Sequence, residues 1–270
     1  MTWLEAIILG IVQGLTEFLP VSSSGHLTIG RALLGVEASG DIVFEVAVHA
    51  ATVLATIIVF RKSIFSLLKG FFKFRNNDET DYILKICVSM IPVFVVGVFF
   101  KDAVEVLFTS MTLVGLALLL TSLLLYFSDK AAMFRADSCE TKMSRNGISY
   151  LQAFIVGIAQ AFAVVPGLSR SGTTIATGLL CGVKREVMAQ FSFLMVIVPI
   201  LGEAFLNVAG GDFSQSSIGA VPLVCGFVSA FVSGLFACKL MIALVKKAKL
   251  KWFALYCALI GLAVIISQLV

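Results

Sequence analysis

Six long apolar runs constrain this 270-residue chain more than any other feature. A transmembrane helix needs about 20 mostly apolar residues, because the hydrocarbon core of a bilayer is about 30 Å thick. The runs are residues 41–60, 83–100, 110–128, 187–208, 218–244 and 252–269. Charged residues make up only 13% of the chain, about half of the share that a soluble domain carries. The sequence therefore predicts an all-α integral membrane protein.

Two further apolar segments are related by an internal repeat. Residues 6–35 align without a gap over residues 153–182, and ten of the 30 pairs are identical. The identical pairs include Gly10/Gly157, Gln13/Gln160, Ser22/Ser169, Ser24/Ser171 and Gly25/Gly172. Proline, glycine and serine break each segment into two stretches that are too short to cross a bilayer comfortably. Each segment is therefore expected to form a re-entrant helical hairpin, which is tolerated in a membrane when it lines a cavity or lies inside protein.

Basic residues indicate how the chain crosses the membrane. They crowd three connecting segments, namely residues 61–75, 129–147 and 246–251, whereas 101–109 and 209–217 carry few. These basic residues are Arg61, Lys62, Lys69, Lys73, Arg75, Lys130, Arg135, Lys142, Arg145, Lys246, Lys247, Lys249 and Lys251. By the positive-inside rule the three basic segments are cytoplasmic. The first hairpin then enters the membrane from outside, and the second enters from the cytoplasm.

The repeat and the charge pattern together predict an inverted-topology repeat. Each half is a re-entrant hairpin followed by three transmembrane helices, and an odd number of spans inverts the second half. Repeat 1 covers about residues 1–128, a cytoplasmic loop covers 129–147, and repeat 2 covers 148–270. The two repeats form a single membrane domain over residues 1–270.

The two hairpin tips are expected to meet near the middle of the membrane, where such broken helices form binding sites. The tips read Pro20-Val-Ser-Ser-Ser-Gly25 and Pro166-Gly-Leu-Ser-Arg-Ser-Gly172. Serine is a natural N-cap, so a new helix is expected to begin at each tip. Free N–H groups and the positive ends of two helix dipoles would then face one point. This arrangement predicts an anion site, and phosphate is the usual ligand.

Glu17 is the first candidate for chemistry. A carboxylate within an apolar helix costs about 2.5–3.5 kcal/mol at the membrane centre, so such a residue indicates a function. Gln13 lies four residues earlier, on the same helical face. Their oxygens are ligands suited to Mg²⁺ or Ca²⁺, with diphosphate oxygens completing the shell. The alternative is a purely structural Glu17 that binds loop amides; the second half keeps Gln160 but has Val164 in place of the acid.

Ser23, His26 and Arg170 are the other candidates. His26 follows Ser23 by three residues, so both lie on the first turn of the second helix of the hairpin. A histidine can accept a proton from serine or water, or attack phosphorus itself. Arg170 matches Ser23 in the repeat and binds phosphate oxygens through two N–H groups, or else pairs structurally with Glu17. Further hydroxyl donors are Ser169, Ser171, Thr173 and Thr174.

Other ionisable residues lie within or beside the apolar runs. Glu45 and His49, four residues apart, are expected to form a supporting pair, a proton path or an internally satisfied pair. Lys85 and Lys239 are expected to extend toward the membrane surface. Arg31, Glu37 and Asp41 are expected at the outer rim, and Glu203 has no assigned role.

The motif from Gln13 to His26, QGLTEFLPVSSSGH, and the motif from Pro166 to Thr174, PGLSRSGTT, resemble the bacterial undecaprenyl-diphosphatase family, which is also known for bacitracin resistance. The resemblance implies hydrolysis of undecaprenyl diphosphate to the monophosphate and phosphate, which recycles the lipid carrier of cell-wall synthesis. It also implies a divalent cation and a site open to the periplasmic face of the cytoplasmic membrane. The implied catalytic residues are Glu17, Ser23, His26 and Arg170, and the implied supporting residues are Gln13, Ser22, Ser169, Ser171 and Thr174. Glutamine at position 13 leaves one carboxylate fewer than the family pattern allows.

Three versions of the reaction are open at this point. Ser23 activated by His26, water activated by His26, or His26 itself attacks the terminal phosphorus of a polyprenyl diphosphate, whose chain stays in the lipid between helices. Arg170, the helix N-termini and a metal near Glu17 offset the developing charge. A lipid-phosphate flippase or an anion transporter is the alternative, because inverted repeats with hairpins are also transporter architecture. No nucleic acid partner is expected, and the sequence leaves open a homo-oligomer.

Overall fold

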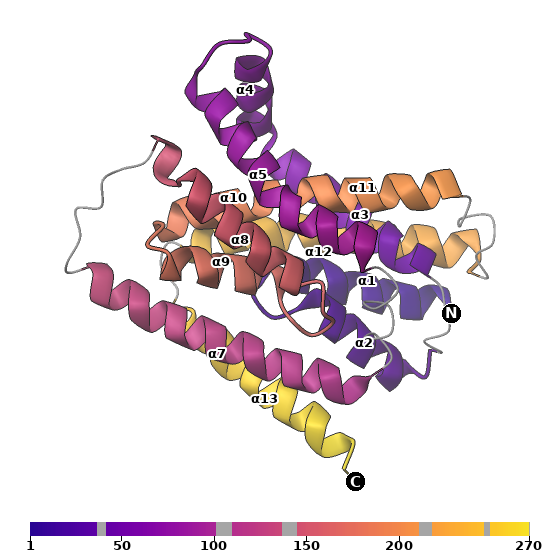
Figure 1. The fold of residues 1–270 in the computed structure, drawn as a ribbon. Coiled ribbons are helices and arrows are strands. Elements are labelled where there is room, and N and C mark those ends of the chain that lie inside the picture. The colour runs from indigo at the N-terminus through magenta and orange to yellow at the C-terminus, as the bar shows by residue number, and fades with distance from the viewer. Residues whose placement is uncertain (37–41, 101–109, 137–144, 211–217, 246–248, 270) are drawn as a thin grey trace.

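The structure, a computed structural model, describes residues 1–36, 42–100, 110–136, 145–210, 218–245 and 249–269. Every regular element among these residues is helical (Figure 1). The protein is therefore an all-α membrane protein, as the sequence predicts. Several residues considered above lie outside the described part of the chain or have side chains outside it: Glu37, Asp41, Arg135, Lys142, Glu203, Lys246, Lys247 and residues 101–109 and 211–217.

The predicted spans correspond to long apolar helices. Among the described residues, four helical stretches are long and apolar enough to cross a membrane, and α3 (Ile42–Val59) passes this test together with α4 (Arg61–Phe71), from which it is bent by 77°. The sixth run forms α13 (Lys251–Ser267), an apolar helix of 17 residues. The remaining helices of this set are α5 (Asp78–Phe99), α7 (Met111–Ala136), α10 (Arg185–Met195), α11 (Ile197–Gly210) and α12 (Ala220–Val245).

The fourth predicted span is interrupted at Val196, between α10 and α11. Pro199 explains the break, because proline has no N–H to bond the carbonyl four residues earlier and its ring crowds that carbonyl. Proline is tolerated in the first turn of a new helix, where Pro199 lies. The interruption places Ser192 and the start of α11 beside the hairpin of the second half.

Both expected hairpins are present. The first consists of α1 (Trp3–Phe18) and α2 (Ser23–Leu34), and the second of α8 (Tyr150–Phe162) and α9 (Arg170–Leu180). Their caps occupy matching positions in the repeat. Thr2 and Ser149 each form a capping box, with Glu5 and Gln152 respectively. Ser22 accepts from Gly25 N–H at 3.2 Å and Ser169 accepts from Gly172 N–H at 3.1 Å, as expected for N-cap serines.

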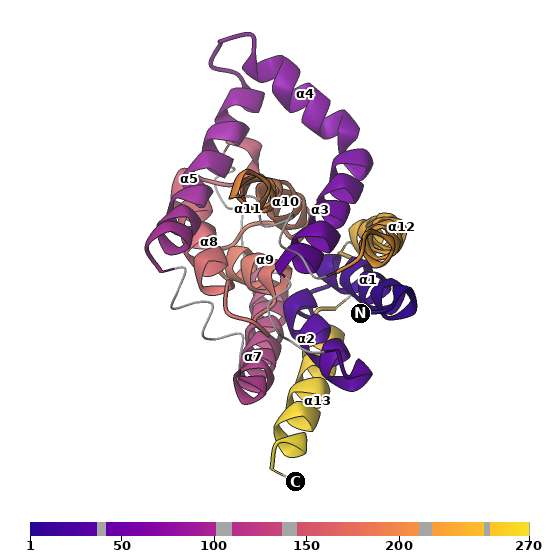
Figure 2. The same ribbon diagram turned by 90° about the vertical axis from the view of Figure 1, so that its right-hand side faces the viewer.

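The two halves pack against each other in reciprocal pairs. Helix α1 packs on α12 of the other half, and α8 packs on α5, the corresponding helix of the first half. Helices α7 and α13 lie side by side in both views (Figures 1 and 2). They cross at two glycines, because a Cβ on Gly115 would lie 3.1 Å from Gly261 O and a Cβ on Gly261 would lie 2.9 Å from Gly115 O.

The hairpin tips are in direct backbone contact. A Cβ on Gly25 would lie 3.1 Å from Gly167 Cα, and a Cβ on Gly172 would lie 3.3 Å from Pro20 Cβ. Gly25 matches Gly172 in the repeat, and Pro20 matches Gly167, so these two contacts are also reciprocal. Ser171 Oγ donates to Leu19 O at 3.1 Å and links the tips further. The tips therefore meet inside the protein, as the sequence predicts.

The first basic segment is a helix over much of its length, which corrects its prediction as a loop. Helix α4 runs from Arg61 to Phe71 and, with the turn that follows, bridges the ends of α3 and α5 (Figure 2). Ile64, Leu67 and Phe71 recur at helical spacing, and the first glycine of the segment is Gly70. The apolar periodicity of this segment therefore predicts its helical structure better than its number of charged residues does.

Lys85, which lies in an apolar run, has polar partners inside the protein. Its side chain is only 2% exposed, and Nζ donates to Asp81 Oδ2 at 2.5 Å and to Arg145 O at 2.7 Å. Asp81 lies one helical turn before Lys85 on α5, so the charge is paired within the protein. Lys239 is exposed.

Candidate active site

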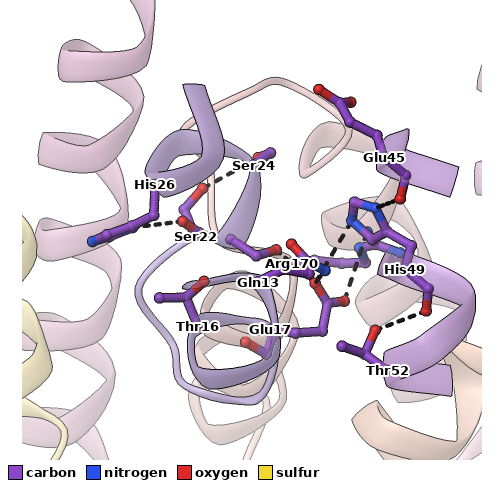
Figure 3. A network of polar contacts seen from close by, with 12 residues as sticks. Gln13, Thr16, Glu17, Ser22, Ser24, His26, Glu45, His49, Thr52 and Arg170 are labelled. Atoms are coloured by element: carbon purple, nitrogen blue, oxygen red, sulfur yellow. Dashed lines mark hydrogen bonds and ion pairs between the residues drawn. The ribbon is translucent and has the colours of Figure 1, made fainter. Parts of the chain in front are cut away.

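Glu17 is the centre of the polar cluster at the hairpin tips (Figure 3). Its side chain is 8% exposed. Gln13 Nε2 and Ser23 Oγ both donate to Oε2, at 2.9 and 2.6 Å. Arg170 Nη2 lies 3.9 Å from Oε1, and His49 Nε2 lies 3.7 Å from Oε2. One buried carboxylate therefore contacts residues from both hairpins and from α3.

The first hairpin positions Glu17 and Ser23 through the break in its helix. Glu17 lies in the last turn of α1, and Gln13 is one turn earlier on the same face. The chain reverses at Leu19–Val21, and Ser23 is the first residue of α2. The reversal brings the serine back onto the carboxylate, so two residues six positions apart form a hydrogen bond that a continuous helix would not allow.

The second hairpin positions Arg170 as the first residue of α9. The preceding Ser169 caps this helix, and its own N–H donates to Thr121 Oγ1 of α7 at 3.1 Å. Thr174 Oγ1 lies 2.7 Å from Ser192 Oγ, and it also donates to Arg170 O at 2.8 Å. Ser169 and Thr174 therefore fix the backbone on both sides of the guanidinium.

His26 lies away from Ser23. Its Nδ1 is 2.7 Å from Ser22 O and its Nε2 is 2.8 Å from Tyr256 Oη, with the His26 and Tyr256 rings stacked at 5.6 Å. Figure 3 shows the ring directed away from Glu17. The structure therefore pairs Ser23 with Glu17 rather than with His26, because both ring nitrogens of His26 already have partners.

His49 belongs to the polar cluster around Glu17, whereas the Glu45 side chain, one helical turn earlier, does not. His49 Nδ1 donates to the backbone carbonyl of Glu45 at 2.8 Å, and the ring faces Glu17. The Glu45 carboxylate instead pairs with Arg31 Nη1 at 2.8 Å. The two side chains therefore do not pair with each other, and they are linked only through the Glu45 carbonyl. The sequence feature that indicates a role for His49 is its position as an ionisable residue inside an apolar span.

A pocket adjoins Glu17 and Arg170. Its other polar walls are hydroxyls and an amide from four helices: Thr52, Thr56, Gln160, Ser171, Thr174 and Ser192. Four of these hydroxyls, those of Thr52, Thr56, Ser171 and Thr174, donate to backbone carbonyls. Arg170 therefore provides the positive charge and the N–H donors of this wall, which suit an anion.

Two oxygen-bearing side chains fit a divalent cation. Gln13 Oε1 is buried and has no hydrogen-bond partner, and Glu17 provides a carboxylate beside it. Such oxygens suit Mg²⁺ and Ca²⁺. Within the described ranges, no three His, Cys, Asp or Glu side chains are grouped as in a complete metal site. The remaining ligands would have to come from the substrate and water.

Comparisons with known proteins identify the family. A family model described as "Bacitracin resistance protein BacA" matches residues 6–263. The chain belongs to this family. An undecaprenyl-diphosphatase of Bacteroides thetaiotaomicron is 54% identical over 273 residues, with 100% of both chains covered. Undecaprenyl-diphosphatases of Parabacteroides distasonis (54% identical, covering 100% of this chain and 99% of the relative) and Methanosphaera stadtmanae (37%, covering 99% and 98%) also match.

Proposed function

We propose that this BacA family member hydrolyses undecaprenyl diphosphate to undecaprenyl phosphate and phosphate. This reaction recycles the lipid carrier for cell-wall synthesis and gives bacitracin resistance. The observation that carries the proposal is that relatives named undecaprenyl-diphosphatase match the chain end to end at up to 54% identity. The buried cluster of Glu17, Ser23 and Arg170 supplies the groups that such a phosphoryl transfer needs.

Ser23 and Glu17 are the proposed nucleophile and base. Ser23 Oγ already donates its proton to Glu17 Oε2 at 2.6 Å, within the reach required of a general base. In the proposed step, Oγ attacks the terminal phosphorus, the proton passes to Glu17, and undecaprenyl phosphate leaves. Water then hydrolyses the phosphoserine and releases phosphate. Attack by a water held at the same carboxylate is the alternative.

Arg170 is proposed to bind the phosphoryl group that is transferred. The guanidinium lies at the start of α9 and beside the pocket, so its N–H groups and the helix N-terminus act on the same oxygens. Ser169, Ser171 and Thr174 hold this turn, and Ser22 caps α2 opposite. His26, which Ser22 O and Tyr256 Oη orient, is proposed to act at the outer edge of the site rather than on Ser23.

A divalent cation, Mg²⁺ or Ca²⁺, is proposed to be held by Glu17 and Gln13. When bound, it would neutralise charge on the diphosphate oxygens. The unpartnered Gln13 Oε1 supports this assignment, because a buried amide oxygen without a partner is unfavourable. The chain's own residues orient the substrate and move the serine proton.

The proposed topology is an inverted repeat in the bacterial cytoplasmic membrane, with the site open to the periplasmic face. Three observations support it: the matching caps of the two hairpins, the reciprocal packing of α1 on α12 and α8 on α5, and the reciprocal glycine contacts at the tips. Figure 1 agrees, because α1 and α8 approach the tips from opposite sides of the view. The polyprenyl chain is proposed to stay in the surrounding lipid.

Phosphate release by the purified protein in detergent tests the function. Long-chain and short-chain polyprenyl diphosphates are compared, each with and without a chelator. We expect release from the long chain that chelation abolishes and added Mg²⁺ or Ca²⁺ restores. A flippase or an anion transporter releases no phosphate in detergent, where there are no compartments, so absence of release in every condition contradicts the proposal.

A further inference from the structure

The protonation of the His49 ring follows from its contacts. Nδ1 lies 2.8 Å from the backbone carbonyl oxygen of Glu45. A carbonyl oxygen can only accept a hydrogen bond, so Nδ1 carries a proton. Nε2 is therefore the ring nitrogen that faces the site.

The atom that His49 Nε2 faces is a hydrogen-bond acceptor. Glu17 Oε2 lies 3.7 Å away, which is longer than a hydrogen bond. Ser23 Oγ and Gln13 Nε2 already donate to this oxygen. At 3.7 Å the nitrogen and the oxygen are too far apart for a direct hydrogen bond, and the separation leaves room for a cation between them.

The separation suits two ligands of one metal ion. Ligand distances of about 2.0–2.3 Å place adjacent nitrogen and oxygen ligands about 3–3.7 Å apart. Histidines that bind metals usually donate their second ring N–H to a carboxylate or a backbone carbonyl, as His49 does to Glu45. Gln13 Oε1, buried and unpartnered, is a third donor from the neighbouring helix.

We propose that His49 binds the divalent cation of this site through Nε2, together with Glu17 and Gln13. This inference rests on the proposed diphosphatase function and adds a ligand that the hairpin motifs do not contain. Two oxygen ligands alone suit Mg²⁺ or Ca²⁺, whereas an imidazole ligand favours transition-metal cations. Mn²⁺ accepts both kinds of ligand, so the site is expected to prefer Mn²⁺ to Mg²⁺.

The chain contains only two histidines, which makes a direct test practical. The full-length protein, carrying a tag without histidine, is labelled with ¹⁵N-histidine and loaded with Mn²⁺ for pulsed electron paramagnetic resonance. We expect a coupling to histidine nitrogen that changes on labelling, disappears in His49→Gln and remains in the matched control His26→Gln. A missing histidine coupling in the labelled wild-type protein, or a coupling lost only in His26→Gln, overturns the inference.

Affinity provides a second readout. His49→Gln should weaken Mn²⁺ binding by about 10–100-fold, the range seen when metal-site residues are altered, and Mg²⁺ binding by less. Equal affinities in the wild type and His49→Gln overturn the inference. A labelled wild type without a histidine coupling overturns the inference even when the His49→Gln variant does not fold, and a coupling that remains in His26→Gln supports it without that variant. If the wild type releases no phosphate, the proposed function fails; if it releases phosphate but Mn²⁺ has no histidine ligand, only the His49 inference fails.

Discussion

At the first hairpin tip, Ser22 caps α2 and Ser23 is its first residue; at the second, Ser169 caps α9 and Arg170 is its first residue. The cap bonds are nearly the same, at 3.2 and 3.1 Å. One tip presents a hydroxyl beside Glu17, and the other presents a guanidinium. The comparison teaches that the duplicated backbone builds the site, while single substitutions at matching positions divide the chemistry between the two halves.

The backbone also differs between the two caps. Ser22 has φ of 70°, in the region that favours glycine, whereas Ser169 has φ of −67°. A non-glycine residue held at positive φ costs about 1–3 kcal/mol and is typical of functional sites. The strained backbone therefore lies at the tip that carries the proposed nucleophile and base.

Removing the guanidinium of Arg170 at the second tip should have the largest effect on the rate. Arg170→Ala is expected to lower kcat of phosphate release by about 10³–10⁵-fold, the range for an arginine that stabilises phosphoryl transfer. Arg170→Lys should retain part of the rate, because it keeps the charge without the two parallel donors. Arg185→Ala, which alters a pair with Asp129 outside the site, is the control. If kcat of Arg170→Ala lies within tenfold of the wild-type value, the proposed role of the second tip in stabilising the phosphoryl group is contradicted.

Removing the base of the first tip comes next. Glu17→Gln is expected to lower kcat by about 10²–10⁴-fold, since it keeps the shape of the side chain and loses the proton acceptor. Adding Val164→Glu, which restores a carboxylate at the matching position of the second tip, should not recover the rate. Recovery measured in the double variant would indicate that the tips are interchangeable.

The packing of the second tip against α7 should govern stability. Gly167 has φ of 90°, and a Cβ on it would lie 2.5 Å from Val114 O. Gly167→Ala is therefore expected to destabilise the protein by about 1–3 kcal/mol, measured as a lower Tm in detergent. In the control Gly97→Ala, nothing lies within 4 Å of the added carbon, so Tm should not fall. Equal Tm values for the two variants would refute the proposed close approach.

The smallest effect is expected at the outer edge of the first tip. Tyr256→Phe removes the hydroxyl that contacts His26 Nε2 and keeps the stacked ring. A single hydrogen bond contributes about 0.5–1.5 kcal/mol, so kcat/KM should change by less than about tenfold. A loss as large as that of Glu17→Gln would mean that the first tip works through His26 instead of Glu17.

Local sequence patterns predict the hairpins and most of the site. The helical period places Gln13 and Glu17 on one face, and the break at Pro20 and Ser22 brings Ser23 back to Glu17. The repeat places Arg170 at the matching position of the second tip, where it faces Glu17. These relations depend on residues close in sequence or on the duplication itself. They are the reason why the motif residues, apart from His26, are found in one cluster.

The contacts that the sequence does not reveal depend on tertiary packing. His26 and Tyr256 are 230 residues apart, and only the packing of the bundle places α13 beside α2. His49 was expected to pair with Glu45, but the two side chains leave α3 toward different neighbours. Helix α4 is hard to predict because its basic residues are typical of a loop, although its apolar residues recur at helical spacing.

The glycine contacts at the tips bear on how much the two halves can move. A carrier built from two such halves works by tilting one half against the other, so that its site faces each compartment in turn. A Cβ on Gly25 would lie 3.1 Å from Gly167 Cα, and tilting one half against the other would open this close contact. An enzyme that hydrolyses its lipid substrate within one leaflet does not need the two halves to move against each other. The close contact between the halves therefore favours a hydrolase over a transporter.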